Sequence, residues 1–236
     1  MAKPTLYTQE MIGRYTANGN WGHLTLSDYW NRNAQGYPHK EAVVDFRTRL
    51  TWSQAKLWID RLALGFVEIG LTKDEVVVIQ LPNCVELACL RVACERAGLL
   101  CLPAQRVLRH LEMETILKHT RARAIVIPWK FRDFNYYEMI KELKPSLPSL
   151  VFILIWGEES PPGEKLLRTM LANPIETRYP AEFLESKKMP VTEFSLIGIT
   201  TGTTGKPKFV ETPLCALLSS GGEIDYLKLT GDDIIV

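Results

Sequence analysis

The sequence predicts an α/β fold in which a mainly parallel sheet carries helices on both faces. Short runs of Val, Ile and Leu recur between segments of helical periodicity, as in repeated strand–helix units. Several of these runs are apolar at almost every position, which is typical of strands buried on both faces of a sheet. Glycine and proline mark many of the boundaries between strand-like and helix-like segments.

Residues 1–50 predict two polar-faced helices followed by a small hairpin. Thr25 and Ser27 are candidate N-caps of the second helix, because a hydroxyl can accept from the free N–H groups of a first turn. The predicted elements are helices 8–18 and 25–35 and strands 41–46 and 49–51.

Residues 51–156 predict strand–helix repeats. Thr51-Trp52-Ser53-Gln54 matches a capping box, and Gly70 can end the helix that it opens. Trp58 lies in the apolar stripe of that helix, which favours a core position for its ring. Asn83 is a candidate cap for the helix through Arg96. The other predicted elements are strands 75–81, 99–102, 124–128 and 150–156 and helices 112–120 and 134–143.

Residues 157–193 interrupt this rhythm with five prolines. They predict an irregular excursion across the surface of the sheet, with short helices at 164–172 and 181–186. A buried strand at 194–199 follows, then a strand at 208–211, a helix near 213–228 and the start of a strand at 232–236.

Composition predicts a cytoplasmic protein without a membrane span. The chain has 236 residues, 46% of them hydrophobic and 23% charged, with a net charge of +1. This balance gives no reason to expect nucleic acid or an anionic membrane as a partner. No apolar run reaches the ~18 residues that a membrane helix needs, and the first residues lack the apolar core of a signal peptide.

The cysteines and histidines predict neither disulfides nor a metal site. Five cysteines are an odd number, none forms a C-x-x-C pair, and small buried hydrophobes in a reducing compartment are the expected role. The four histidines are far apart and lack metal-ligand spacing. These residues are Cys84, Cys89, Cys94, Cys101, Cys215, His23, His39, His110 and His119.

Residues 200–208 carry the strongest functional signal and read Thr-Thr-Gly-Thr-Thr-Gly-Lys-Pro-Lys. Glycines let the backbone turn tightly, so that consecutive N–H groups can form a concave anion site. The threonine hydroxyls add donors and the lysines add positive charge. Since strands are predicted on both sides, the segment predicts a polyphosphate loop between two strands.

This loop differs from a P-loop, which needs G-x-x-x-x-G-K-[ST] followed by a helix. The residue five places before Gly205 is Thr200 instead of glycine, and Pro207 follows Lys206. A dinucleotide-binding oxidoreductase is also disfavoured, because no G-x-G-x-x-G follows a predicted strand.

The loop resembles that of the adenylate-forming superfamily, whose members include acyl-CoA synthetases, aryl-acid AMP ligases and adenylation domains. Their pattern is close to Thr-Ser-Gly-Thr-Thr-Gly-x-Pro-Lys-Gly. Thr201 replaces the serine and keeps a hydroxyl, whereas Phe209 replaces the final glycine, at a position where aryl-acid ligases often carry an apolar residue. Four other segments resemble the superfamily: Gln80-Leu81-Pro82-Asn83, Ala97-Gly98, Leu102-Pro103-Ala104-Gln105-Arg106 and Phe134-Asn135-Tyr136. The last two of these are similar to segments of 2,3-dihydroxybenzoate-AMP ligases.

The resemblance implies ATP-dependent activation of a carboxylic acid to an acyl-adenylate, with release of pyrophosphate. The acyl group then passes to the thiol of CoA or of carrier-protein phosphopantetheine. ATP and Mg²⁺ are the implied cofactors, and no protein nucleophile is needed, so no catalytic side chain is assigned. Lys208 is implied as the phosphate-binding cation, whereas Lys206 stands at a variable position and is expected to face solvent. The implied phosphate-binding residues are Thr200, Thr201, Gly202, Thr203, Thr204, Gly205 and Lys208.

The resemblance also implies that residues 1–236 are the N-terminal portion of an AMP-binding ligase domain, without its C-terminal lid. The expected parts are 1–50, 51–156, 157–193 and 194–236, and we expect this portion alone to be inactive. The alternative is a non-catalytic nucleotide- or phosphate-binding domain from a truncated relative. The choice between aromatic or alicyclic and fatty acids, the choice of thiol acceptor and a homodimeric state stay open.

Overall fold

A seven-stranded sheet forms the centre of the protein, in a computed structural model that describes residues 7–200, 207–219, 228 and 230–234. The strand order is β11-β10-β4-β3-β5-β8-β9, and every neighbouring pair is parallel except β10 with β11. The predicted α/β class with a mainly parallel sheet is therefore confirmed. The strands are β3 (Val76–Ile79), β4 (Leu100–Pro103), β5 (Ala124–Pro128), β8 (Phe152–Trp156), β9 (Lys165–Leu166), β10 (Phe194–Thr200) and β11 (Lys208–Pro213).

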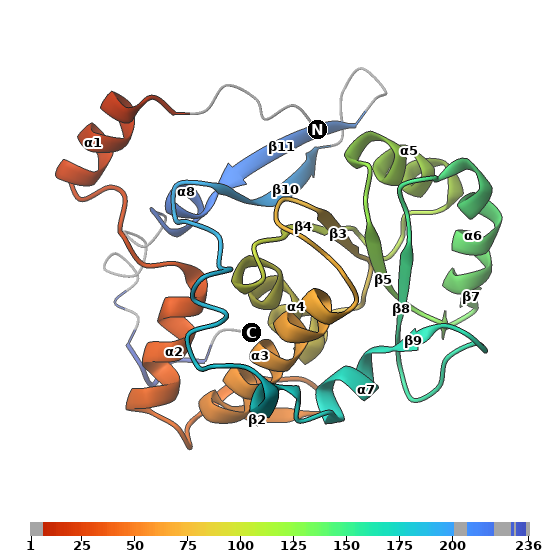
Figure 1. Ribbon diagram of the computed structural model, residues 1–236, viewed down its shortest axis with the longest axis horizontal. Helices are drawn as coiled ribbons and strands as arrows, with labels where there is room; N and C mark the ends of the chain where they lie inside the picture. The colour runs from red at the N-terminus through yellow and green to blue at the C-terminus, as the bar shows by residue number, and fades with distance from the viewer. Residues whose placement is uncertain (1–6, 201–206, 220–227, 229, 235–236) are drawn as a thin grey trace.

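Helices cover both faces of this sheet and enclose two separate cores. Side chains that alternate along β3 divide between the cores: Val77 and Ile79 face one, and Val76 and Val78 face the other. Figure 1 shows α5 and α6 on one side of β5 and β8 and α3 and α4 on the other. The helices of the first face are α3 (Trp52–Glu68), α4 (Val85–Arg96) and α7 (Leu167–Ala172), and those of the second are α5 (His110–Thr120) and α6 (Tyr136–Leu143).

Helix α3 begins at the predicted capping box. The Thr51 hydroxyl accepts from the Gln54 N–H at 3.3 Å, and the Gln54 side chain accepts from the Thr51 N–H at 2.9 Å. Gly70 follows the helix with a φ of 93°, a conformation that suits glycine. Trp58 is half-buried and packs against the first core, which agrees with its predicted role.

Helix α4 is capped from a distant segment, and the predicted Asn83 cap is wrong. Cys84 is the N-cap residue and its side chain caps nothing. The carboxylate of Asp45 instead accepts from the Val85 N–H at 3.0 Å. Asp45 lies between β1 (Glu41–Val44) and β2 (Arg49–Thr51), where it also accepts from two N–H groups of its own turn. Burial raises the pKa of Asp45, but these backbone hydrogen bonds together hold it below its ordinary value.

The N-terminal segment forms α1 (Gln9–Ala17) and α2 (Leu26–Gly36). Helix α1 projects from the body and buries no residue, as Figure 1 shows at the upper left. Thr25 caps α2 as predicted, but Ser27 lies inside the first turn of the helix and is no cap. The Ser27 N–H and hydroxyl instead donate to the buried carboxylate of Glu95 on α4, at 3.2 and 2.8 Å. A buried carboxylate thus ties α2 to the main body.

Replacing Glu95 with glutamine should remove part of the pH dependence of stability. Burial raises the pKa of Glu95 above its ordinary value of 4.5, so the folded state binds this proton more tightly than the unfolded state. Glu95 therefore adds stability at low pH and loses this contribution as the pH rises through the raised pKa. We expect Glu95→Gln to have a higher free energy of unfolding than wild type, and this difference should become smaller as the pH falls. Urea titrations at several pH values measure it. For the control Glu182→Gln, which changes an exposed residue, the difference from wild type should stay constant with pH. The same constancy for Glu95→Gln would contradict the prediction.

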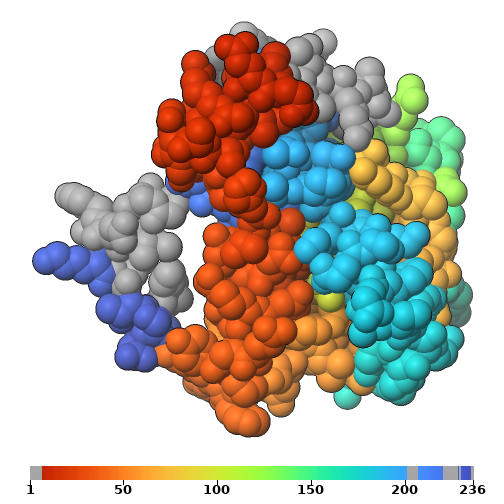
Figure 2. Space-filling view, turned by 60° about the vertical axis from the view of Figure 1, so that its left-hand side comes forward, coloured from red at the N-terminus to blue at the C-terminus, as the bar shows by residue number. Residues whose placement is uncertain are grey.

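The excursion at 157–193 adds an unpredicted strand to the sheet. Its Lys165–Leu166 segment pairs with β8 as β9, and the predicted first helix is shortened to α7. The η2 turn of 3₁₀-helix (Ile175–Arg178) follows, but the second predicted helix is wrong because residues 181–186 form turns. Figure 2 shows the later part of this segment beside α2 on the surface.

A chain of ion pairs ties the excursion to three helices. Arg96 is almost fully buried, and its guanidinium lies 2.5 Å from the Asp60 carboxylate and 2.9 Å from that of Glu185. Lys188 lies 2.8 Å from Glu185 and 2.7 Å from Asp28 on α2. The charges alternate in sign along the series Lys56, Asp60, Arg96, Glu185, Lys188 and Asp28.

Gly98 shows how closely the excursion approaches the turn between α4 and β4. It has a φ of 75°, and a Cβ built there would lie 2.6 Å from the carbonyl oxygen of Lys187. Both its backbone conformation and this contact therefore require glycine.

The remaining differences from the sequence prediction are local. Helix α5 begins at His110, and α6 begins at Tyr136 because Phe134 and Asn135 form β7, which pairs with β6 (Lys130–Phe131). The described part of the last predicted helix is α8 (Leu214–Leu218), and residues 220–227 lie outside the described residues. Residues 230–234 form a turn and irregular chain, so the predicted strand start is wrong there. None of the described helices combines the length and apolar character needed to cross a bilayer.

Candidate functional site

The predicted polyphosphate loop connects the two strands of an antiparallel hairpin. Strands β10 and β11 pair in register from Leu196 with Thr212 to Thr200 with Lys208, which places the last two residues opposite each other where the strands end. Both are exposed. The predicted strand–loop–strand arrangement is thus confirmed for the flanking residues. Thr201, Gly202, Thr203, Thr204 and Gly205, together with Lys206, lie outside the described residues.

The two faces of this hairpin have different surroundings. Ile199 and Phe209 are opposite each other and pack against the core under α5 and α6. Because alternate residues of a strand face opposite ways, Thr200 and Lys208 lie on the other face, which also carries the exposed Val210. The Lys208 ammonium is therefore presented on a solvent-facing side of the hairpin, where it can meet an anion.

The hairpin ends at the edge of the sheet where ligands of α/β proteins bind. Strand β10 runs parallel to β4, with Leu196 opposite Cys101, so its carboxyl end points to the same edge as those of β3, β4, β5 and β8. In open α/β sheets, ligands bind outside the carboxyl ends of the strands. This position agrees with the phosphate-binding role predicted for the loop.

Gln80 organises the same edge of the sheet from the end of β3. Its side chain is fully buried, and Nε2 donates to the carbonyl oxygens of Gln105 and Leu108, at 3.2 and 3.0 Å. The Tyr136 hydroxyl donates to the carbonyl oxygen of Arg106 at 3.0 Å. Together these bonds hold residues 104–109 across the end of the sheet, a role that the Gln-Leu-Pro-Asn pattern did not reveal.

A cationic cluster, which we define as Arg106, Arg109, Lys130 and Arg132, lies beyond this segment. The Arg109 guanidinium lies 4.0 Å from the centre of the Phe134 ring, and those of Arg106 and Arg132 lie 5.5 and 5.7 Å from that of Phe131. None of the four forms an ion pair within the described part of the chain. This cluster is therefore free to attract an anionic ligand.

Sequence reasoning missed the cationic cluster because the fold alone assembles it. Arg106 and Arg109 follow β4, whereas Lys130 and Arg132 follow β5, so more than twenty residues separate the pairs. The signal that could have found it is that two cations follow each of two predicted strands of one parallel sheet, and that those after the second strand alternate with aromatic rings.

Cys84 and Cys89 are unsuited to nucleophilic chemistry at neutral pH. Cys89, Cys94, Cys101 and Cys215 are buried and Cys84 is half-buried, as predicted, and all are free cysteines. Burial raises the pKa of Cys84 and of Cys89 to about 12, which keeps both thiols protonated at neutral pH. No set of three or more His, Cys, Asp or Glu side chains in the described ranges is arranged to hold a metal ion.

Helix α4 also holds strand β10 in place. The Arg91 guanidinium donates to the buried Ser195 hydroxyl at 2.8 Å. Hence the strand that leads into the loop is held by a helix as well as by its two neighbouring strands.

A mainly parallel sheet flanked by helices, with a Thr/Gly-rich segment joining two antiparallel strands at its carboxyl edge, defines the chain as an α/β protein. The family model described as "AMP-binding enzyme" matches residues 30–236. The chain belongs to this family of AMP-binding enzymes, as the loop sequence predicted.

Relatives and solved structures agree with this membership. The chain is 30% identical to a 2-hydroxy-7-methoxy-5-methyl-1-naphthoate–CoA ligase of Streptomyces carzinostaticus over 208 residues, which are 86% of this chain and 37% of the relative. It is 27% identical to the vibriobactin-specific 2,3-dihydroxybenzoate-AMP ligase of Vibrio cholerae over 209 residues, 87% of this chain and 37% of that one. The apo structure of MbtA from Mycobacterium smegmatis has the same fold, with a TM-score of 0.83 at 23% identity over 97% of this chain and 41% of MbtA. The chain thus spans little more than a third of the length of these curated relatives.

Proposed function

We propose that the protein containing this chain activates a carboxylic acid with ATP and passes the acyl group to a thiol. The observation that carries the proposal is the Thr/Gly/Lys loop at the end of the β10–β11 hairpin, in a chain of the AMP-binding family. The substrate's carboxylate oxygen attacks the α-phosphorus, the bond to the bridging oxygen breaks, and pyrophosphate leaves. A thiol sulfur then attacks the acyl carbon, and AMP leaves.

The loop's part in this chemistry is to position and neutralise the triphosphate. Backbone N–H groups of residues 202–205 and the hydroxyls of Thr200, Thr201, Thr203 and Thr204 donate to phosphate oxygens. Lys208, exposed opposite Thr200, adds the positive charge. Mg²⁺ would be held mainly by the triphosphate, since this ion is bound mainly by substrate phosphates and few protein groups, and it would supply further positive charge there. Charge placed where it develops during the reaction accelerates the first step.

The proposal also includes the chemical class of the carboxylic acid. Relatives named for a substituted naphthoate, for salicylate and for 2,3-dihydroxybenzoate support an aromatic acid. Relatives named medium-chain acyl-CoA ligases support fatty acids as the second class. We propose an aromatic acid first, because the aryl-acid relatives align over 86–87% of this chain and because residues 102–106 and 134–136 resemble 2,3-dihydroxybenzoate-AMP ligases.

The thiol acceptor is CoA or the phosphopantetheine of a carrier protein. Both acceptors carry phosphate, and the cationic cluster beyond the end of β4 and β5 suits such a group. We further propose that the protein works in the cytoplasm, where reduced thiols agree with its free cysteines, and that a homodimer is its assembly.

The test is ATP–pyrophosphate exchange with the full-length protein. Salicylate, 2,3-dihydroxybenzoate, a hydroxynaphthoate and octanoate should be compared, with and without Mg²⁺, and the active acid should then be offered CoA or a loaded carrier protein. We expect exchange that depends on Mg²⁺ and is strongest with an aryl acid. ATP binding without exchange for any acid would favour the non-catalytic alternative, and failure to bind either ATP or pyrophosphate in calorimetry would overturn the proposal.

A further inference from the structure

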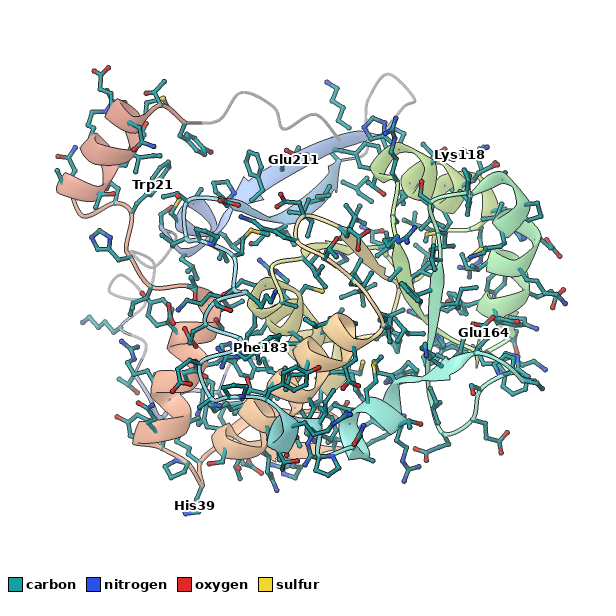
Figure 3. The ribbon with its side chains drawn as sticks, viewed as in Figure 1. Trp21, His39, Lys118, Glu164, Phe183 and Glu211 are labelled. Carbon is teal, nitrogen blue, oxygen red and sulfur yellow. The ribbon has the colours of Figure 1, made fainter. Side chains whose placement is uncertain are left out.

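Two rings connect the exit of the phosphate loop to the neighbouring helix. Phe209 directly follows Lys208, and its ring is stacked on that of His119, in the last turn of α5. The ring centres are 4.2 Å apart and the planes differ by 10°. Figure 3 labels Lys118 in the same turn of α5 and Glu211 in β11, which locates the two elements that the stack joins.

Strand β11 has little other support near the loop. It is an edge strand of the sheet, and among the described residues it pairs with β10 alone. An edge strand lacks the second ladder of hydrogen bonds that fixes an inner strand, so its end is free to shift unless side chains hold it. The His119 imidazole is exposed, whereas Phe209 is half-buried against the second core. The stack therefore fixes this end of β11 from the face that α5 covers.

The direction of Lys208 follows from that of Phe209. Neighbouring residues of a strand project to opposite faces, so a Phe209 ring held against α5 turns the Lys208 side chain to the open face. A glycine after this lysine, as in the pattern that the loop resembles, would leave His119 without a partner ring. The stack is thus a feature of this chain's own sequence.

We propose that His119 and Phe209 act as positioning residues, which hold the exit of the loop so that Lys208 meets the triphosphate. This inference rests on the proposed function, because it assigns the stack a purpose in ATP binding. Neither ring touches the reacting atoms. Aromatic stacking is directional, and a ring pair of this kind suffices to change the population of a correctly placed lysine by about three- to tenfold.

The first test is a kinetic comparison in the full-length protein. Phe209→Gly and His119→Ala should each raise the KM for ATP by about three- to tenfold, with the KM for the acid unchanged. His119→Phe keeps a flat ring and should restore the wild-type KM for ATP. Val210→Ala is the matched control, since Val210 is exposed on the same strand but on its other face, and it should stay within about twofold of wild type.

A merely structural contact would behave differently in the same experiment. The stack variants would then lower Tm while the KM for ATP matched that of Val210→Ala, or His119→Phe would fail to restore the KM. Either result would overturn the inference. His119 lies on the surface, so His119→Ala is expected to fold even if Phe209→Gly does not.

A second readout separates this inference from the proposed function. Hydrogen–deuterium exchange of the ligand-free protein reports on β11 without any use of ATP. Exchange at residues 208–213 should be faster in Phe209→Gly and His119→Ala than in wild type and Val210→Ala. Unchanged exchange would overturn the positioning role even in an active enzyme. Faster exchange in a protein that binds no ATP would refute the proposed function, and with it the purpose of the stack in ATP binding, but would leave the support of β11 by the stack in place.

Discussion

Lys208→Ala should reduce ATP–pyrophosphate exchange by about a hundredfold, because it removes the cation proposed to neutralise the triphosphate. Lys208 is exposed opposite Thr200 at the mouth of the β10–β11 hairpin, on the face away from α5. The loss should appear in kcat/KM for ATP, with little change in Tm, since an exposed lysine contributes little to folding. Steady-state exchange at saturating acid and variable ATP measures this effect.

Lys206→Ala is the matched control for Lys208→Ala. Both residues are lysines of one loop, but the variable position of Lys206 predicts a solvent-facing side chain, so exchange should stay within about twofold of wild type. Equal losses in the two variants would show that the loop needs only general positive charge. An active Lys208→Ala enzyme with wild-type KM for ATP would remove Lys208 from the site.

Arg96→Met should destabilise the protein by about 3–5 kcal/mol, because it breaks a buried ion pair and leaves the Asp60 and Glu185 carboxylates with one cation fewer. The Arg96 side chain is only 5% exposed, and that of Asp60 is 13% exposed. The methionine fills most of the space, so the loss reports mainly on the missing charge. Lys56 still pairs with Asp60 at 2.5 Å, which places the expected value toward the lower end of this range. Urea unfolding at neutral pH measures the free energy.

Arg49→Met provides the control for Arg96→Met. Arg49 and Glu41 also form a close pair, at 2.6 Å, but both side chains are more than half exposed. Exposed pairs contribute little, so this variant should unfold at the wild-type urea midpoint. If Arg96→Met unfolded at that same midpoint, the ion-pair series would have no role in holding the excursion to α3 and α4.

The parts of the fold that could be predicted from the sequence are those whose signals are local. The Val and Ile run of β3 indicates a doubly buried strand on its own, and Thr51 with Gln54 marks the start of α3 within four residues. The prediction that Asn83 caps α4 failed because the residue that does cap it, Asp45, lies some forty residues away in the chain. Two-residue β9 has no periodicity to detect, and 181–186 has polar spacing that suits turns as well as a helix.

The candidate site shows the same division between local and long-range signals. The strand–loop–strand placement of Thr200 and Lys208 followed from apolar runs on both sides of a Thr/Gly segment. The cationic cluster and the His119–Phe209 stack depend on which strands become neighbours in the sheet. No short segment of the sequence predicts this order. The roles of residues 201–205 stay predictions.

The Asp45 cap has a consequence for how the protein can be shortened. One carboxylate closes the β1–β2 turn and also satisfies the first N–H group of α4, a helix at the centre of the first core. A version that starts after this turn would lose more than a surface hairpin, because α4 would begin with an unsatisfied amide beside the sheet. The early segment is therefore an integral part of the folding unit, and expression boundaries for further experiments should lie before it.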